Sequence, residues 1–116
     1  MKYALLKLRN LSGRNRRLSV TGYVEWVLAD QRTRSQMHVV SEVDLGSGVL
    51  TARNPYNTEF EGRCAFFDVD AQTDAETGGL RRGFTADRLE FLGRNGSLAQ
   101  PAALARAALS GRTGVG

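Results

Sequence analysis

Apolar and polar residues alternate along residues 16–28, and the rest of the chain can be interpreted around this stretch. The residues that share its apolar parity are Leu18, Val20, Val24, Trp26 and Leu28. A period of two, with Val, Thr, Tyr and Trp enriched, predicts a β-strand with one buried face. Gly22 interrupts the apolar parity, as a glycine does at a bulge or where another backbone approaches closely. We expect Trp26, the single tryptophan, to anchor the core.

Similar patterns predict further strands at residues 3–9, 36–44, 49–53 and 63–69. Turn-forming residues at 10–15 would join the first of these strands to the Trp26 strand. The glycine-rich segment 44–48 would join the next two strands as a hairpin. Residues 29–35 are polar and charged, which predicts a loop. The last strand carries Cys-Ala-Phe-Phe at its centre and is predicted to be buried.

The remaining segments predict little helix. Residues 85–92 suit a short helix or 3₁₀ segment with Thr85 as its cap, and residues 101–109 carry strong helix formers after a proline. Residues 70–83 are acidic and then glycine-rich, which indicates a flexible insertion, and residues 110–116 are typical of a frayed tail. The sum predicts one all-β domain, an antiparallel β-sandwich with a short C-terminal helix.

Length and composition place the chain among ordinary globular domains. Its 116 residues suit one domain, and the apolar and charged fractions are 41% and 24%. No apolar run approaches the roughly 18 residues of a membrane span. The hydrophobic stretch at the start of the chain is too short for a signal peptide. A single cysteine cannot form an internal disulfide. We therefore expect a cytoplasmic protein with no direct membrane contact from this segment.

The net charge is +4, and the basic side chains gather near the N-terminus. The members of this basic cluster are Lys7, Arg9, Arg14, Arg16 and Arg17. Such a cluster is typical either of a phosphate or nucleic-acid interface or of a charged turn between strands. No stacking aromatic residues are interleaved with it, as proteins that bind single strands require. We favour the turn and keep nucleic-acid binding as an alternative.

Metal and thiol chemistry find little support. The acidic segment after Asp68 fails the calcium-loop spacing, because Thr73 takes the place of the required glycine and Gly79 that of the final glutamate. His38 is the single histidine and Cys64 the single cysteine, so no His/Cys metal set can be assembled. We expect His38 to be structural or on the surface and Cys64 to be an inert buried thiol, with no cofactor.

Carboxylates and one polar loop offer the remaining candidate chemistry. Glycoside cleavage requires two carboxyl groups at a fixed separation, and the candidates by type are Glu25, Glu42, Glu59 and Glu61. The sequence does not set their distances. The loop at 54–62 packs Asn, Tyr and Glu, which hydrogen-bond to and stack on sugars, into one surface segment. An alternative interpretation, a turn whose Asn and Pro merely set the backbone, stays open.

Four segments together resemble the cyclic β-1,2-glucan synthases. They are Leu-Ser-Val-Thr-Gly-Tyr-Val-Glu-Trp-Val-Leu (18–28), Met-His-Val-Val (37–40), Ala-Arg-Asn-Pro-Tyr-Asn-Thr-Glu-Phe (52–60) and Phe-Leu-Gly-Arg-Asn-Gly-Ser-Leu (91–98). The resemblance is to the phosphorylase-like region of those proteins, which is grouped with the cellobiose and chitobiose phosphorylases (formerly glycosyltransferase family 36, now glycoside hydrolase family 94). It covers nearly the whole chain. One departure is at residues 78–85, which look longer than the usual turn.

The resemblance implies a fold and limits the chemistry. Members of the family begin with a galactose-mutarotase-like β-supersandwich, followed by linker helices, an (α/α)₆ barrel and a small β domain. This chain resembles only the later part of the supersandwich. The general-acid Asp and the phosphate-binding residues of such enzymes lie in the barrel, so the resemblance implies a partial, non-catalytic sandwich domain.

The resemblance also suggests a ligand and partners. The family resemblance implies five candidate sugar contacts, which are Asn54, Tyr56, Asn57, Glu59 and Arg63. We expect a non-catalytic, carbohydrate-associated module that gives structural support and makes accessory contact with a β-glucan oligosaccharide. Open sheet edges predict a homodimer. The alternatives are a self-associating structural fragment without a ligand and a basic nucleic-acid-binding protein, although no nucleic acid is expected.

Overall fold

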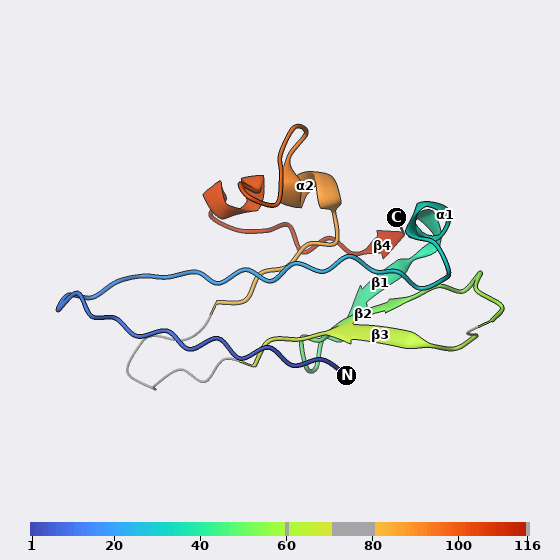
Figure 1. Cartoon of the computed structure of the whole chain (residues 1–116), viewed down its shortest axis with the longest axis horizontal. Helices are drawn as coiled ribbons and strands as arrows, with labels where there is room; N and C mark the ends of the chain where they lie inside the picture. The colour runs from blue at the N-terminus through green and yellow to red at the C-terminus, as the bar shows by residue number, and fades with distance from the viewer. Residues whose placement is uncertain (60, 71–80, 116) are drawn as a thin grey trace.

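The described residues form one antiparallel sheet with short helical segments at its end. The computed structural model describes residues 1–59, 61–70 and 81–115 (Figure 1). Its elements are α1 Arg32–Ser35, the 3₁₀ segment η1 Gln36–His38, β1 Val40–Val43, β2 Leu50–Arg53, β3 Cys64–Phe67, α2 Arg88–Leu92, the 3₁₀ segment η3 Ala102–Ala105 and β4 Gly114–Val115. The strands lie in the order β3-β2-β1-β4, and each neighbouring pair is antiparallel. The predicted all-β class is confirmed.

The hairpin of β1 and β2 forms where the glycine-rich turn predicts it. Val40 pairs with Arg53, and Val43 pairs with Leu50. The Asp44 carboxylate accepts the backbone N–H of Ser47 at 3.1 Å, and the Asp44 N–H donates to the Val49 carbonyl at 3.0 Å. These bonds close the turn, as Asp side chains commonly do. The hydrogen bond from the Ser47 hydroxyl is the main reason that the pKa of Asp44 is lowered.

The sheet has one partly buried face and one exposed face. Ala52 is 1% exposed at the centre of the first face, where it pairs with Ser41 on one side and Ala65 on the other. The Phe67 ring lies on this face directly beneath Gly22, where a Cβ atom would come within 2.6 Å of the ring. The predicted close approach at Gly22 therefore comes from a side chain rather than from another backbone.

The two strands predicted in the first part of the chain are not formed. Residues 3–9 and 16–28 are extended but pair with no other described segment, and they make a long arm that turns at 10–15 (Figure 1, blue). The turn is present: the Asn10 side chain donates to the Arg14 carbonyl at 2.6 Å. Leu18 and other apolar residues of the arm are exposed, and Trp26 is only half-buried rather than a core anchor. An alternating pattern specifies a face to bury, but it does not specify the partner strand.

The segment before β1 is helical rather than a loop. The Ser35 N–H and hydroxyl both donate to the Gln31 carbonyl, at 3.1 and 2.9 Å, and they close the turn of α1. The 3₁₀ segment η1 follows, so the predicted strand at 36–44 begins at Val40. The alternating residues of 36–39 belong to this helical turn instead.

Three predictions toward the C-terminus also need correction. The cap of α2 is Asp87 rather than Thr85, because the Asp87 carboxylate accepts the Glu90 N–H at 3.0 Å. The helix predicted at 101–109 is limited to η3. In the segment expected to be a frayed tail, Gly114 and Val115 pair with β1 as β4. Most of the insertion predicted at 70–83 lies outside the described residues.

Strand β3 forms at the predicted place but is not buried. It is an edge strand, and its register puts Cys64 and Phe66 on the outer face, where both are exposed. Cys64 is therefore an exposed thiol and not the buried one that the apolar run suggests. Periodicity alone does not separate a central strand from an edge strand.

The chain exposes far more surface than a compact protein of its size. Its accessible area is 10148 Å², whereas a compact monomer of 12.7 kDa exposes about 6200 Å². Its radius of gyration is 16.4 Å, against about 13 Å for a compact domain of this length. The buried apolar side chains among the described residues are Val39, Ala52, Phe91 and Leu92. The arm and the outer face of the sheet thus present uncovered apolar surface.

The turn after α2 depends on a glycine. A Cβ atom at Gly96 would lie 1.6 Å from the Leu92 carbonyl oxygen, which is backbone and cannot move aside locally. We expect Gly96→Ala to destabilise the protein by about 3 kcal/mol, measured as a lowered midpoint of thermal unfolding. The control is Gly46→Ala, where the nearest atom is the Asp44 carboxylate at 3.7 Å. Equal midpoints for the two variants would contradict this packing.

Candidate functional site

The loop that follows β2 is fixed to the base of the arm by two asparagines. The Asn54 and Asn57 side-chain amides both donate to the backbone carbonyl of Leu28, at 3.1 and 2.9 Å. Both asparagines are half-buried. Because one carbonyl oxygen has two acceptor positions, Leu28 can satisfy both donors at once. The loop and the arm are therefore held together at a single atom.

The same asparagines also set the backbone of the loop. The Asn54 side-chain oxygen accepts the Tyr56 N–H at 3.0 Å, and the Asn57 side-chain oxygen accepts the Glu59 N–H at 3.1 Å. These are Asx turns, the local arrangement that Asn side chains favour. The nitrogen and the oxygen of each side-chain amide therefore both form hydrogen bonds within the protein. This geometry matches the interpretation of the loop as a turn set by its asparagines, and their direct contact with a sugar stays a prediction.

All five candidate sugar contacts border two adjoining shallow depressions. The first has a volume of about 220 Å³ and is lined by Val27, Leu28, Ala29, Asn54, Asn57 and Arg63. The second has a volume of about 340 Å³, and Tyr56 and Glu59 line it together with the same two asparagines. The structure therefore brings the predicted residues to one face, although it divides them between two hollows.

Charged and aromatic residues that no sequence motif indicates as sugar contacts also line the second depression. Asp30, Arg34 and His38 line it from the segment that contains α1 and η1. The His38 and Tyr56 rings lie with their centroids 4.7 Å apart and their planes at 44°. The sequence predicts a loop at residues 29–35 and a strand around His38, so no sequence signal places these residues beside Tyr56. A helical spacing of four residues between Arg34 and His38 could have indicated a shared face.

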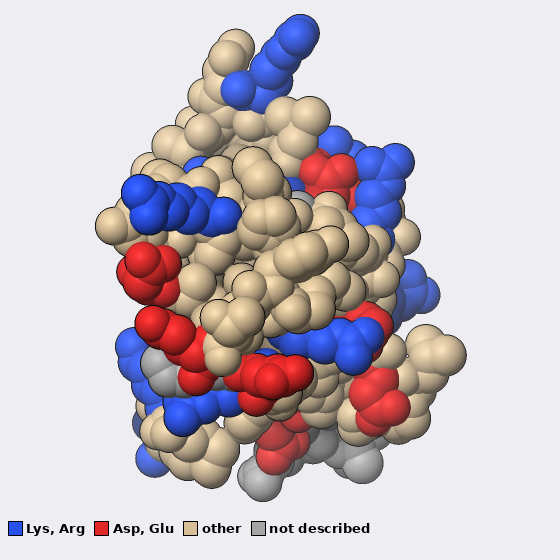
Figure 2. Space-filling view, turned by 90° about the vertical axis from the view of Figure 1, so that its right-hand side faces the viewer, with Lys and Arg blue, Asp and Glu red and all other residues tan. Residues whose placement is uncertain are grey.

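The face that carries these depressions has mixed charge. Figure 2 looks onto the end of the molecule where α1 and the connection from β2 to β3 lie, and acidic and basic side chains are interspersed there. A nucleic-acid interface needs a continuous basic surface instead. The predicted basic cluster lies elsewhere, on exposed residues of the arm around its turn.

Two of the four candidate carboxylates, Glu25 and Glu42, have structural partners. Glu25 accepts a hydrogen bond from the Tyr23 hydroxyl at 2.6 Å and forms an ion pair with Arg32 at 3.0 Å. The Tyr23 hydrogen bond is the main cause that lowers the pKa of Glu25, and Arg32 lowers it further. A general acid needs a raised pKa, so this environment is wrong for that role. Glu42 forms an ion pair with Arg53 across the hairpin at 2.8 Å.

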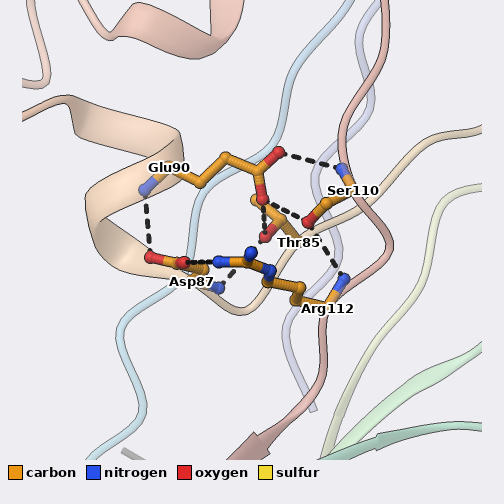
Figure 3. Close-up of polar contacts among 5 residues, drawn as sticks. All are labelled: Thr85, Asp87, Glu90, Ser110 and Arg112. Carbon is orange, nitrogen blue, oxygen red and sulfur yellow. Dashed lines mark hydrogen bonds and ion pairs between the residues drawn. The ribbon is translucent and has the colours of Figure 1, made fainter.

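A second polar cluster joins α2 to the C-terminal segment. Figure 3 shows the Glu90 carboxylate accepting hydrogen bonds from the Thr85 hydroxyl at 2.7 Å and the Ser110 N–H at 2.9 Å. Asp87 accepts a bond from Arg112 at 2.8 Å. The Ser110 hydroxyl also donates to the Glu90 carboxylate, and this bond is the main cause that lowers the pKa of Glu90. The Glu90 N–H is the main cause that lowers the pKa of Asp87. This cluster fixes the segment that leads into β4.

The comparisons with known proteins agree with the sequence resemblance. Residues 1–116 match the family described as glycosyl hydrolase 94, supersandwich domain, and the chain belongs to this family. The chain is also 43% identical over 115 residues to the cyclic beta-(1,2)-glucan synthase NdvB of Rhizobium meliloti (strain 1021). That match covers 98% of this chain but spans only 4% of the relative. No solved structure shows a significant match. The predicted family and its supersandwich fold are thus confirmed.

The described part of the chain offers neither a membrane-spanning helix nor a cluster of metal ligands. Within residues 1–59, 61–70 and 81–115, no helix is both long and apolar enough to cross a membrane. In the same ranges, no three or more His, Cys, Asp or Glu side chains gather as metal ligands would.

The tether between α2 and the C-terminal segment should weaken in acid. Glu90 and Asp87 have pKa values lowered from 4.5 and 3.8, so they stabilise the folded tether above those values. That stabilisation is lost as the pH falls through the lowered folded values. We expect the protection of the Gly114 amide in β4, measured against its intrinsic exchange rate at each pH, to fall below about pH 4 and to change little between pH 6 and pH 8.

A substitution should reproduce this loss at neutral pH. In Glu90→Gln, an N–H₂ group replaces one of the two carboxylate oxygens that accept bonds from Thr85 and Ser110. Because the tether would then lose at least one of these bonds, amide exchange at Gly114 should already be fast at pH 7. The control is Glu42→Gln, whose ion pair with Arg53 lies on the exposed face of the hairpin. Slow exchange in Glu90→Gln, equal to that of the control, would argue against the tether.

Proposed function

We propose that this chain is a non-catalytic supersandwich module of a cyclic β-glucan synthase or phosphorylase-like protein. Its role is structural support together with an accessory contact to β-glucan. The observation that carries this proposal is the match of residues 1–116 to the supersandwich family, with 43% identity to a cyclic β-(1,2)-glucan synthase. The activity named for that relative belongs to a protein of which this chain spans 4%. We therefore assign it to the other parts of such proteins.

The partners of the carboxylates support a non-catalytic role. Glu25 is held in its ionised form by Tyr23 and Arg32, and Glu42 is paired with Arg53. Glycosidases instead keep one carboxyl group protonated near neutral pH beside a second one that is ionised. The paired carboxylates of this chain thus suit attachment between segments rather than bond cleavage.

The depressions beside the β2–β3 connection support an accessory glucan contact. Their combined lining offers two side-chain amides, two guanidinium groups, two carboxylates and two aromatic rings within one face. A sugar presents many hydroxyl groups that both donate and accept, so it suits a lining that contains both kinds of partner. The shallow shape fits a weak contact along a chain rather than an enclosed substrate pocket.

Titration with β-1,2-gluco-oligosaccharides tests the contact. We expect backbone amide shifts around Tyr56 and Glu59 at millimolar sugar, because a shallow polar surface gives weak affinity. An equal concentration of an α-linked oligosaccharide, such as maltotriose, is the control for viscosity and nonspecific effects. If millimolar β-glucan leaves the spectrum unchanged, the accessory contact is refuted and the structural role alone remains.

We also propose that the isolated chain forms a homodimer. Strand β3 is an edge of the sheet, and Phe66 on its outer face is 56% exposed. Edge strands with apolar side chains tend to pair with another chain. The excess of exposed area over that of a compact monomer also favours association.

Light scattering measures the assembly directly. At micromolar concentration we expect twice the monomer mass of 12.7 kDa. Phe66→Lys places a charge on the edge strand and should give a monomer. The control is Leu45→Lys in the hairpin turn, where Leu45 is already 96% exposed and the mass should stay that of the dimer. A monomeric mass for the unsubstituted chain at every concentration would rule out the dimer.

A further inference from the structure

We infer that the Tyr56 and His38 rings form a stacking platform for a neutral β-linked gluco-oligosaccharide, and that Asn54 and Asn57 position the loop without touching the sugar. This inference rests on the proposed glucan contact and divides its residues into two roles. It adds His38, Arg34 and Asp30 to the site. It also removes two asparagines from the group of direct contacts.

The platform is an exposed aromatic ring on a fixed backbone. Tyr56 is 74% exposed, although its N–H is bonded to Asn54 and its loop is bonded to Leu28. An exposed ring on a mobile loop would lose conformational entropy on binding, whereas this loop is already held in place. The His38 ring lies 4.7 Å away at 44°, so the two rings form an angled apolar surface beside the second depression.

The chemistry of a β-glucose ring matches this surface. Its hydroxyl groups point outward around the ring, so its two faces carry C–H bonds that pack against aromatic rings. Aromatic side chains provide a large rigid apolar area at a low entropic cost. The depression of about 340 Å³ has room for a short stretch of sugar chain rather than a buried oligomer.

The charges around the platform favour a neutral ligand. Arg34 lines the depression as a donor, while Asp30 and Glu59 line it as acceptors. A phosphorylated or otherwise anionic ligand would meet both carboxylates and be repelled. A neutral polyol can instead pair its hydroxyl groups with all three side chains. The mixed lining therefore selects a sugar over a polyanion.

The asparagines have a different role because their amides are already engaged. Each N–H₂ group donates to the Leu28 carbonyl, and each side-chain oxygen accepts the backbone N–H two residues on. These four bonds hold the loop, and Tyr56 with it, in place, and each asparagine fills this role without a ligand. Asn54 and Asn57 thus act on the ligand through the ring that they position.

The test uses the whole chain and a β-1,2-gluco-oligosaccharide, with binding followed by NMR. We expect Tyr56→Ala to weaken binding at least tenfold, because it removes the stacking face. Tyr56→Phe keeps the ring and should bind within about twofold of the unsubstituted chain. His38→Ala should weaken binding several-fold. The matched control is Tyr3→Ala on the arm, where Tyr3 is 81% exposed, and it should leave the affinity unchanged.

Intermolecular NOEs separate the two roles. Sugar protons should give NOEs to the Tyr56 ring and none to the side-chain amide protons of Asn54 or Asn57. NOEs to those amides would overturn the positioning role. Equal affinity of Tyr56→Ala and the unsubstituted chain, or an equal loss in Tyr56→Phe, would overturn stacking while leaving the proposed glucan contact intact. If the unsubstituted chain binds no β-glucan, both the platform and the proposed contact fail.

Discussion

The rest of the candidate site depends on the two hydrogen bonds that the Leu28 carbonyl accepts. One oxygen atom accepts the amides of Asn54 and Asn57, and so it joins the base of the arm to the loop after β2. The chain then turns immediately into α1 and η1, which bring His38 beside Tyr56. The two depressions exist because these segments are held at this point. Removing the bonds would separate the segments that line them.

Other contacts hold the arm at its base in the same way. Glu25 joins it to α1 through Arg32 and to α2 through Arg88, and the Tyr23 ring stacks on Phe91 with centroids 5.0 Å apart. Gly22 lets the chain pass close over the Phe67 ring. The arm is therefore fixed at residues 22–28 and uncovered before them. Each of these contacts involves a residue of the alternating stretch at 16–28. None of them is a backbone hydrogen bond between paired β-strands.

The sequence allows the local features to be predicted, but not the partners of the extended segments. The hairpin at Asp44 could be predicted because its turn is closed by residues within the turn itself. The strand at 16–28 could not, since alternation says nothing about which segment supplies the hydrogen bonds. At the site, residue type indicated Tyr56 and Glu59, which line the same depression. The roles of Asn54 and Asn57 depend on a carbonyl far away in the chain, which no local pattern reports.

The large exposed area of the folded chain has a thermodynamic consequence. The heat capacity of unfolding grows with the apolar surface that unfolding newly exposes to water. A chain that already leaves 10148 Å² exposed when folded has less surface left to expose. Its stability curve is therefore flatter with temperature than that of a compact domain of equal length. Any association that covered the arm would carry its own heat-capacity change, because it would remove from water the apolar surface that folding leaves exposed.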